Sequence, residues 1–242
     1  MDWIDSNTYF GSWPKRRLDV PADALVALLR EAGTSRAMTL SLVAPLLDAR
    51  EGTKTTLDEC LAHRELIPFG CVSPRDYTGG EEVRELATLG CAAVRLTNAL
   101  SGWPVDYAPL EVVLAECAGA SLPAFLDVTG PGQITQIERL ASKTGATIVL
   151  CGGGYATLSE AMVCLARTRN LFFETSKLNT PDGVKLLCDE AGADHVMFGS
   201  GAPFHYATSA RRVAEHAGLT DDQVSWVASR TLRSLLREEF RT

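Results

Sequence analysis

The sequence predicts an α/β fold, a single (β/α)8 TIM barrel over residues 1–242 with an extra C-terminal helix. The chain has 242 residues, close to the roughly 250 that are typical of one such barrel. Short apolar runs alternate with amphipathic helical stretches from one end to the other. No linker, low-complexity tract or charge run divides the chain, so a closed barrel is favoured over an open doubly wound sheet, which stays the alternative.

Eight β-leaning segments are expected to be parallel strands. Some of them, such as residues 146–150, are apolar on both faces, as strands are in a parallel sheet covered by helices. The predicted strands are Trp3–Asn7, Arg36–Ala44, Ile67–Ser73, Ala92–Asn98, Ala124–Val128, Thr147–Cys151, Leu171–Thr175 and His195–Ser200.

Between these strands, apolar positions recur at helical spacing. One further helix, Asp221–Phe240, is expected after the last strand, because Trp226, Leu232 and Leu235 recur along it and Asp221 lies near its start. The helices predicted between the strands are Ala22–Glu31, Leu57–Arg64, Glu81–Leu89, Ala108–Cys117, Ile134–Lys143, Leu158–Ala166, Val184–Glu190 and Thr208–His216.

The composition argues against several classes of partner. The formal net charge is -7 and the pI is about 5.2, so nucleic acid and anionic membrane surfaces would repel the protein. No apolar run approaches the roughly 18 residues of a membrane-spanning helix, and the N-terminus shows no secretory signal.

The seven cysteines form no CxxC pair, which favours free thiols in a reducing compartment. We expect a cytoplasmic protein with a small-molecule partner, and a homo-oligomer stays open.

In a (β/α)8 barrel, chemistry takes place at the carboxyl ends of the strands and in the loops that follow them. This rule selects a set of polar, charged and aromatic side chains that are expected around one mouth. They are Asn7, Tyr9, Trp13, Arg16, Arg17, Arg95, Asn98, Trp103, Asp127, Thr129, Cys151, Glu174, Ser176 and the segment 200–205, which ends in His205.

Five segments resemble the motifs of amidohydrolase-related barrels, and they follow one another in the same order. Ile4–Gly11 resembles the opening Ile-Asp-x-His-x-His-x-Gly, and Val196–Phe204 resembles the closing Phe-Gly-Ser-Asp-x-Pro-Phe. The other three segments are Ile67–Pro74, Gly90–Leu96 and Val149–Gly154. The resemblance runs nearly end to end. It implies a barrel of this family, with its active site at the mouth.

The resemblance also shows where this sequence departs from the family. The positions at which these barrels hold a divalent metal are occupied here by Asn7, Tyr9, Asp127, Cys151 and Gly201. Zinc prefers histidine, thiolate and carboxylate ligands, so Asp127 and Cys151 alone leave a site short of ligands. We therefore expect no metal and no other cofactor, and a chemistry that does not depend on a metal.

Three residues are predicted to be catalytic. Asp127, His205 and Tyr9 would carry out acid–base chemistry at the mouth, with Asp127 as the general base. The alternative for Asp127 is structural, an ion pair with Arg95, whose charge needs a partner if it is buried. Three roles stay open for Cys151: it is a nucleophile, a substrate contact or a buried thiol.

Eight residues are predicted to bind the substrate, a small anion. Arginine is expected among them because its guanidinium binds carboxylates in a bidentate fashion, and two tryptophans would give the pocket a flat apolar wall. The glycines 152–154 either cradle an anion or form a tight turn. The eight residues are Asn7, Trp13, Arg16, Arg95, Asn98, Trp103, Cys151 and Ser176.

Taken together, these features predict an enzyme of the hydrolase or decarboxylase (lyase) type that acts on a small anionic substrate. The alternative is a non-catalytic barrel that binds a small molecule or a protein partner. The fold does not choose between the two, because function resides in the site.

Overall fold

The computed structural model describes residues 1–76, 81–180 and 182–241, and for Arg16 it describes the backbone alone. Within these residues, a curled sheet of nine strands has the order β2-β1-β3-β4-β5-β6-β7-β8-β9. All neighbours pair in parallel except β2, which pairs antiparallel with the end of β1. The strands are β1 (Ile4–Trp13), β2 (Leu18–Val20), β3 (Arg36–Ser41), β4 (Leu66–Cys71), β5 (Ala93–Leu96), β6 (Ala124–Asp127), β7 (Ile148–Cys151), β8 (Leu171–Glu174) and β9 (Val196–Met197).

The sheet closes into a barrel between β1 and the segment that follows β9. The backbone N–H of Ser6 donates to the carbonyl of Phe198, and the N–H of Tyr9 donates to the carbonyl of Ala202. Thr8 and Ala202 form an isolated parallel bridge. The predicted (β/α)8 barrel is therefore confirmed, and the open sheet is excluded.

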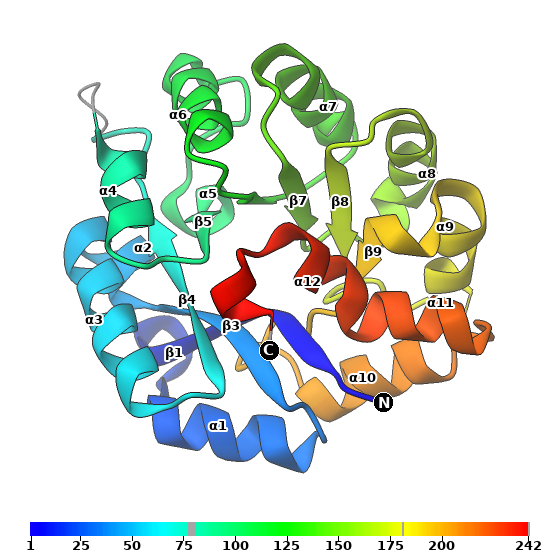
Figure 1. Cartoon of the computed structure of the whole chain (residues 1–242), viewed down its shortest axis with the longest axis horizontal. Helices are drawn as coiled ribbons and strands as arrows, with labels where there is room; N and C mark the ends of the chain where they lie inside the picture. Colours follow the sequence, from blue (N-terminus) through cyan, green and yellow to red (C-terminus); the bar gives the residue numbers. More distant parts are fainter. Residues whose placement is uncertain (77–80, 181, 242) are drawn as a thin grey trace.

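Helices surround the strands, as Figure 1 shows. A continuous apolar layer fills the space between strands and helices, with Leu126 and Ile148 on the strand side and Ile137 and Leu165 on the helix side. None of the helices in the described residues is long and apolar enough to cross a membrane. The surrounding helices are α1 (Ala22–Glu31), α2 (Val43–Leu46), α3 (Ala49–Ala62), α4 (Glu82–Thr88), α5 (Asn98–Ser101), α6 (Ala108–Gly119), α7 (Gln133–Thr144), α8 (Leu158–Arg167), α9 (Gly183–Ala191) and α10 (Ala207–Glu215).

The C-terminal segment differs from the single helix that the sequence predicts. It consists of α11 (Asp221–Ser225), a π-helical turn (Trp226–Arg230) and α12 (Thr231–Leu235), followed by a 3-10 turn (Glu238–Phe240). In Figure 1, α12 lies across the centre of the barrel.

The C-terminal segment covers the end of the barrel at which the strands begin. Leu232 and Leu236 belong to the apolar cluster of the barrel interior. Arg36, the first residue of β3, donates to the carbonyl of Phe240 at 2.8 Å, and Arg237 donates to the carbonyl of Cys91, just before β5, at 2.8 Å. The opposite end, where the strands finish, is left for the mouth.

Candidate functional site

The strand ends surround a cavity of about 100 Å³, which we call the mouth cavity. Six of the residues that the sequence predicts for the site come together here, although they are widely separated in the sequence. They are Asn7, Tyr9, Arg95, Asp127, Ser176 and His205. The cavity is also lined by Ala99, Leu100, Gly152, Lys177, Gly201 and Phe204.

Arg95 and Asp127 form a buried ion pair between the neighbouring strands β5 and β6. The guanidinium of Arg95 also donates to the carbonyls of Leu96 at 3.0 Å and Phe125 at 3.1 Å. Burial lowers the pKa of Arg95, but the charge and hydrogen bond of Asp127, together with the nearby Cys151 and Tyr9, outweigh burial and raise that pKa well above its usual range. The charge of Arg95 is therefore neutralised within the protein, which limits what it can offer to a ligand.

Asp127 is held in position by its neighbours on α5. The Asn98 side chain clamps the backbone of Asp127, since its amide donates to the Asp127 carbonyl and its oxygen accepts from the Asp127 N–H, both at 2.9 Å. The backbone N–H of Ala99 donates to the second carboxylate oxygen of Asp127 at 3.2 Å. Both oxygens of Asp127 thus have partners, and its orientation is fixed.

A second buried carboxyl group, Glu174 at the end of β8, lies beneath the cavity. Its Oε1 accepts from the N–H of Gly152 at 2.6 Å, the hydroxyl of Ser176 at 2.7 Å and the side-chain amide of Asn7 at 3.2 Å. Its Oε2 accepts from the N–H of Ser176 at 2.8 Å. Burial raises the pKa of Glu174, and these donors oppose that effect. Glu174 therefore positions Asn7 and Ser176. Its carboxylate also accepts the hydrogen bond of the Gly152 N–H, which is then not available to an anionic ligand.

Asp5 is the third acidic group beneath the mouth, and it is fully buried. Its Oδ1 accepts from the backbone N–H groups of Ser200 at 2.9 Å and Asn7 at 3.1 Å. Its Oδ2 has no hydrogen-bond partner within the described part of the chain. Burial raises the pKa of Asp5 to about 7, so this group titrates near neutral pH.

Lys177 is a cation that the sequence did not single out. It lies three residues beyond the end of β8, it is exposed, and it lines the mouth cavity. A Cβ added at Gly152 would lie 3.4 Å from its Nζ, so the ammonium group reaches over the end of β7. Across the described ranges, no ion pair involves Lys177. Because Arg95 is already paired, Lys177 is better suited than Arg95 to hold an anionic ligand.

An aromatic group forms one wall of the cavity. Phe204 lines the cavity and contacts Tyr9, with ring centroids 5.7 Å apart, and Trp13, with centroids 5.2 Å apart. The Arg95 guanidinium lies 5.6 Å from the centre of the Tyr9 ring. Burial raises the pKa of Tyr9 well above its usual range. The raised pKa favours the protonated form of Tyr9, whose hydroxyl can donate a hydrogen bond.

Four residues that the sequence predicts as substrate contacts do not line the mouth cavity. Trp13 lies behind Phe204, and Asn98 is engaged by the backbone of Asp127. Trp103 is buried in the apolar layer between strands and helices, where its large ring surface is removed from water. Cys151 is fully buried, and burial raises the pKa of its thiol well above the usual range, which disfavours the reactive thiolate.

The side chain of Arg16, a fifth predicted contact, lies outside what the structure describes.

Solved structures with the same fold match almost the whole chain. A 2,6-dihydroxybenzoate decarboxylase complexed with 2,6-dihydroxybenzoate has a TM-score of 0.76 at 14% identity, over 100% of both chains. A dihydroxybenzoic acid decarboxylase from Polaromonas sp. JS666, with bound manganese and the inhibitor 2-nitroresorcinol, has a TM-score of 0.76 at 17% identity, over 99% of this chain and 98% of that one. An amidohydrolase from Burkholderia multivorans with bound zinc has a TM-score of 0.72 at 16% identity, over 98% of this chain and 100% of that one. No curated protein matches the sequence.

These structures contradict the expectation that no divalent metal takes part, because proteins with this fold hold manganese or zinc. The side chains at the mouth of this protein decide whether a metal would fit here. Asp127 is engaged by Arg95, and the Asn7 amide nitrogen donates to Glu174. Within the described ranges, no three His, Cys, Asp or Glu side chains form a group that could hold a metal ion. The described side chains do not fit a metal, and we assign no chemical step to one.

The sequence itself establishes the family. The model of the family described as "Amidohydrolase" matches residues 8–231. This match begins within β1, includes every later strand, and contains most of the residues that line the mouth cavity. Together with the closed barrel, it shows that this chain belongs to the amidohydrolase family.

Proposed function

We propose that this protein is a hydrolase or decarboxylase that acts on a small carboxylate bound in the mouth cavity. The observation that carries the proposal is that an ammonium group (Lys177), a fixed carboxylate (Asp127) and an imidazole (His205) line one small cavity at the strand ends. Lys177 binds the carboxylate of the substrate. Asn7 and Ser176, which Glu174 holds in place, provide polar contacts beside it.

Asp127 and His205 supply the acid–base chemistry. In decarboxylation, the carbon atom that loses CO2 takes up a proton, and in hydrolysis a base removes a proton from the attacking water. A carboxylate and an imidazole in the same cavity can perform both tasks. Tyr9, which keeps its proton because burial raises its pKa, contributes a hydrogen bond.

The substrate class is suggested by the proteins with the same fold. Two of them are decarboxylases of dihydroxybenzoates, which are small aromatic carboxylates. Such a molecule matches a cavity that combines one ammonium group with the rings of Tyr9 and Phe204. We therefore take small aromatic carboxylates as the first class of substrate.

Turnover of a substrate panel tests the proposal. The panel contains benzoate, mono- and dihydroxybenzoates, and amides and lactones that carry a carboxylate. Each is assayed with and without added Mn²⁺ or Zn²⁺, by release of CO2 and by product analysis. We expect at least one compound to be converted, and Lys177→Ala to raise its KM at least tenfold, because the variant loses a charge-assisted contact worth about 1.5–3 kcal/mol.

Lys185→Ala is the matched control, since Lys185 is ion-paired with Asp189 on the outer surface of α9. It should leave KM unchanged. If Lys177→Ala converts the substrate with an unchanged KM, Lys177 does not bind the substrate. The absence of both binding and conversion across the panel would overturn the proposal.

A non-catalytic barrel that binds a small molecule is the second candidate. The observation that favours it is that both oxygens of Asp127 already have partners, as in a structural ion pair. Asp127→Asn separates the two candidates once its melting curve shows that the variant is folded, because it removes proton transfer and keeps the size of the side chain. A catalytic Asp127 predicts a loss of turnover of about 10²–10⁴-fold with little change in affinity. A ligand that binds the wild-type protein and remains unchanged after long incubation, with or without added metal, favours the binding protein.

A further inference from the structure

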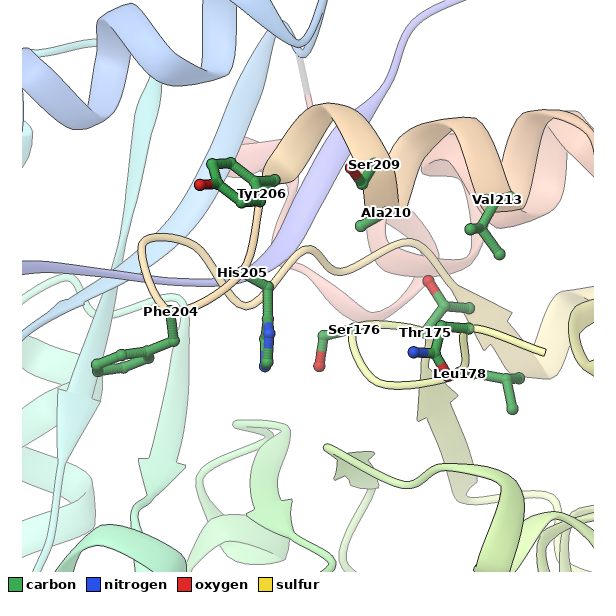
Figure 2. Close-up of a pocket in the computed structure, with 11 residues that line it drawn as sticks. Thr175, Ser176, Leu178, Phe204, His205, Tyr206, Ser209, Ala210 and Val213 are labelled. Carbon is green, nitrogen blue, oxygen red and sulfur yellow. The ribbon is translucent and has the colours of Figure 1, made fainter.

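A second cavity, which we call the side pocket, lies beside the mouth cavity. Its volume is about 320 Å³, against about 100 Å³ for the mouth cavity. Figure 2 shows Thr175, Ser176 and Leu178, from the loop after β8, facing Ala210 and Val213 of α10 across the pocket. The pocket therefore lies between the loop after β8 and the helix that follows β9.

The walls of the side pocket are mainly apolar. Leu178 and Ala214 are almost fully buried beneath it, and Val213 and Phe204 are partly buried around it. Among the described residues that line it, none is Asp, Glu, Lys or Arg. A charged group placed here would lose its hydration without gaining an oppositely charged partner, whereas an apolar group would gain by leaving water.

The side pocket and the mouth cavity meet at three residues that line both of them, Ser176, Phe204 and His205. Gly201 lies at this junction with a φ of +69°, and a Cβ there would be 2.9 Å from Cδ2 of His205 and 3.3 Å from Cβ of Ser176. Because Gly201 has no side chain, the His205 ring lies close to the backbone. Ser176, Phe204 and His205 therefore form the boundary that a ligand of the mouth cavity would pass to reach the side pocket.

We infer that the side pocket is a substrate subsite for an apolar group. The subsite extends the proposed substrate class from benzoates to carboxylates that a short flexible linker joins to a phenyl ring or a branched alkyl chain. The mouth cavity alone is small compared with most ligand pockets, which measure roughly 300–1,000 Å³. The acid end occupies the mouth cavity near Lys177, and the apolar end occupies the side pocket. This inference rests on the proposed function for the position of the acid end.

Calorimetric titration with a graded series of acids tests the inference. The probes are benzoate, 3-phenylpropionate and 5-phenylvalerate, together with 3-phenylpropanol, which has the ring but no carboxylate. We expect one of the two longer acids to bind at least tenfold more tightly than benzoate, which corresponds to about 1.4 kcal/mol. Equal affinity for benzoate and both longer acids would overturn the inference.

Two variants show whether any gain comes from the side pocket. Val213→Phe and Ser209→Phe each place a ring in the pocket from α10, and Ser209 is exposed, so its replacement leaves the packed core intact. Both should abolish the gain of the longer acid and leave the Kd of benzoate unchanged. Val112→Phe, on the exposed face of α6, is the matched control and should change neither value. A gain that persists in both pocket variants would contradict the subsite.

The same titrations distinguish this inference from the proposed function. If benzoate binding depends on Lys177 but lengthening brings no gain, the proposed function stands and the subsite falls. If no acid depends on Lys177 but 3-phenylpropanol binds and is weakened by Val213→Phe, the apolar pocket stands and the carboxylate site falls. If none of the four probes binds, the subsite falls, and the substrate panel decides the proposed function.

Discussion

Arg95 and Asp127 show how a buried charge at the mouth is balanced by a residue on the neighbouring strand. The side chain of Arg95 is almost fully buried, and a buried guanidinium without a partner is strongly unfavourable. Asp127 supplies the countercharge, and two backbone carbonyls accept from the same group. The pair thus fixes the position of a carboxylate at the cavity wall, whatever chemistry that carboxylate performs.

Removing one partner of this pair should destabilise the protein. Asp127→Ala leaves the Arg95 charge buried and unpaired, so we expect the free energy of unfolding to fall by about 3–5 kcal/mol. Replacing both residues, as in Arg95→Met with Asp127→Leu, should recover much of that loss. The measurement is urea denaturation, with the exposed Asp106→Ala as a control that should shift the value by less than about 0.5 kcal/mol. A loss in Asp127→Ala no larger than that of the control would show that the pair is not coupled to folding.

Asp5 gives the protein a pH dependence with a definite sign. Burial raises its pKa from 3.8 to about 7, so between these pH values the folded protein keeps a proton that the unfolded chain has lost. Unfolding then releases a proton, and the free energy of unfolding falls as the pH rises through this window. From pH 5 to pH 8 the decrease should be roughly 3 kcal/mol, at about 1.4 kcal/mol per pH unit until the folded pKa is reached.

Denaturation of Asp5→Asn at the same two pH values checks this assignment. Asparagine stays neutral and its side-chain oxygen can still accept from the N–H groups of Ser200 and Asn7, so the contribution of Asp5 to the pH dependence should disappear. Asp106→Asn, at an exposed position, should leave the wild-type difference unchanged. If Asp5→Asn retains the full difference, another group is its source.

At the scale of whole elements, periodicity located the strands and helices but not all of their limits. The sequence predicts a first strand that ends at Asn7, yet β1 continues to Trp13 because β2 pairs with Gly11–Trp13. This pairing is a tertiary contact that no local pattern reveals. Similarly, α3 begins at Ala49 rather than Leu57. Glycine and threonine make residues 49–56 poor helix formers, but Asp48 caps the helix by accepting from the N–H of Glu51 at 2.8 Å.

The sequence likewise predicts some of the residues that line the mouth cavity and not others. The ion pair of Arg95 with Asp127 is one of two roles that the sequence leaves open, because the two residues come from neighbouring strands; the structure contains this pair. By contrast, Trp103 follows a strand end but turns into the outer apolar layer, since the rule that selects strand ends does not say which way a loop residue faces. Lys177 was missed because an exposed lysine in a loop looks the same in a sequence whether or not it borders a cavity.

The C-terminal segment gives a prediction about one element. Leu232 of α12 is almost fully buried against residues of the barrel interior, at the end opposite the mouth. Leu232→Ala should therefore lower the free energy of unfolding by about 2–5 kcal/mol, from lost burial and the cavity left behind. Leu61→Ala, which changes an exposed leucine of α3, should cost less than about 0.5 kcal/mol. Equal effects in the two variants would show that α12 does not seal the barrel in solution.

On the scale of the whole molecule, the mouth cavity is a consequence of barrel closure. Asn7 and Tyr9 come from β1, whereas Gly201, Phe204 and His205 come from the segment after β9. The backbone hydrogen bonds Tyr9 to Ala202 and Gly201 to Asn7 bring these two ends of the sheet together. Residues from β5, α5, β6 and the loops after β7 and β8 complete the wall, so a partly folded chain does not contain the site.

A ligand of the mouth cavity should therefore stabilise the entire fold. Binding only to the folded state adds about 2.7 kcal/mol when the free ligand is a hundredfold above its Kd. For a domain of this size, about 2–4 °C per kcal/mol corresponds to a rise in Tm of about 5–10 °C. Thermal melts with the aromatic carboxylates of the substrate panel measure this rise. At the same ligand concentration the rise should be much smaller in Lys177→Ala, because the variant binds the acid less tightly, and it should be unchanged in Lys185→Ala. An equal rise in both variants would mean that the acid stabilises the barrel from a surface other than the mouth.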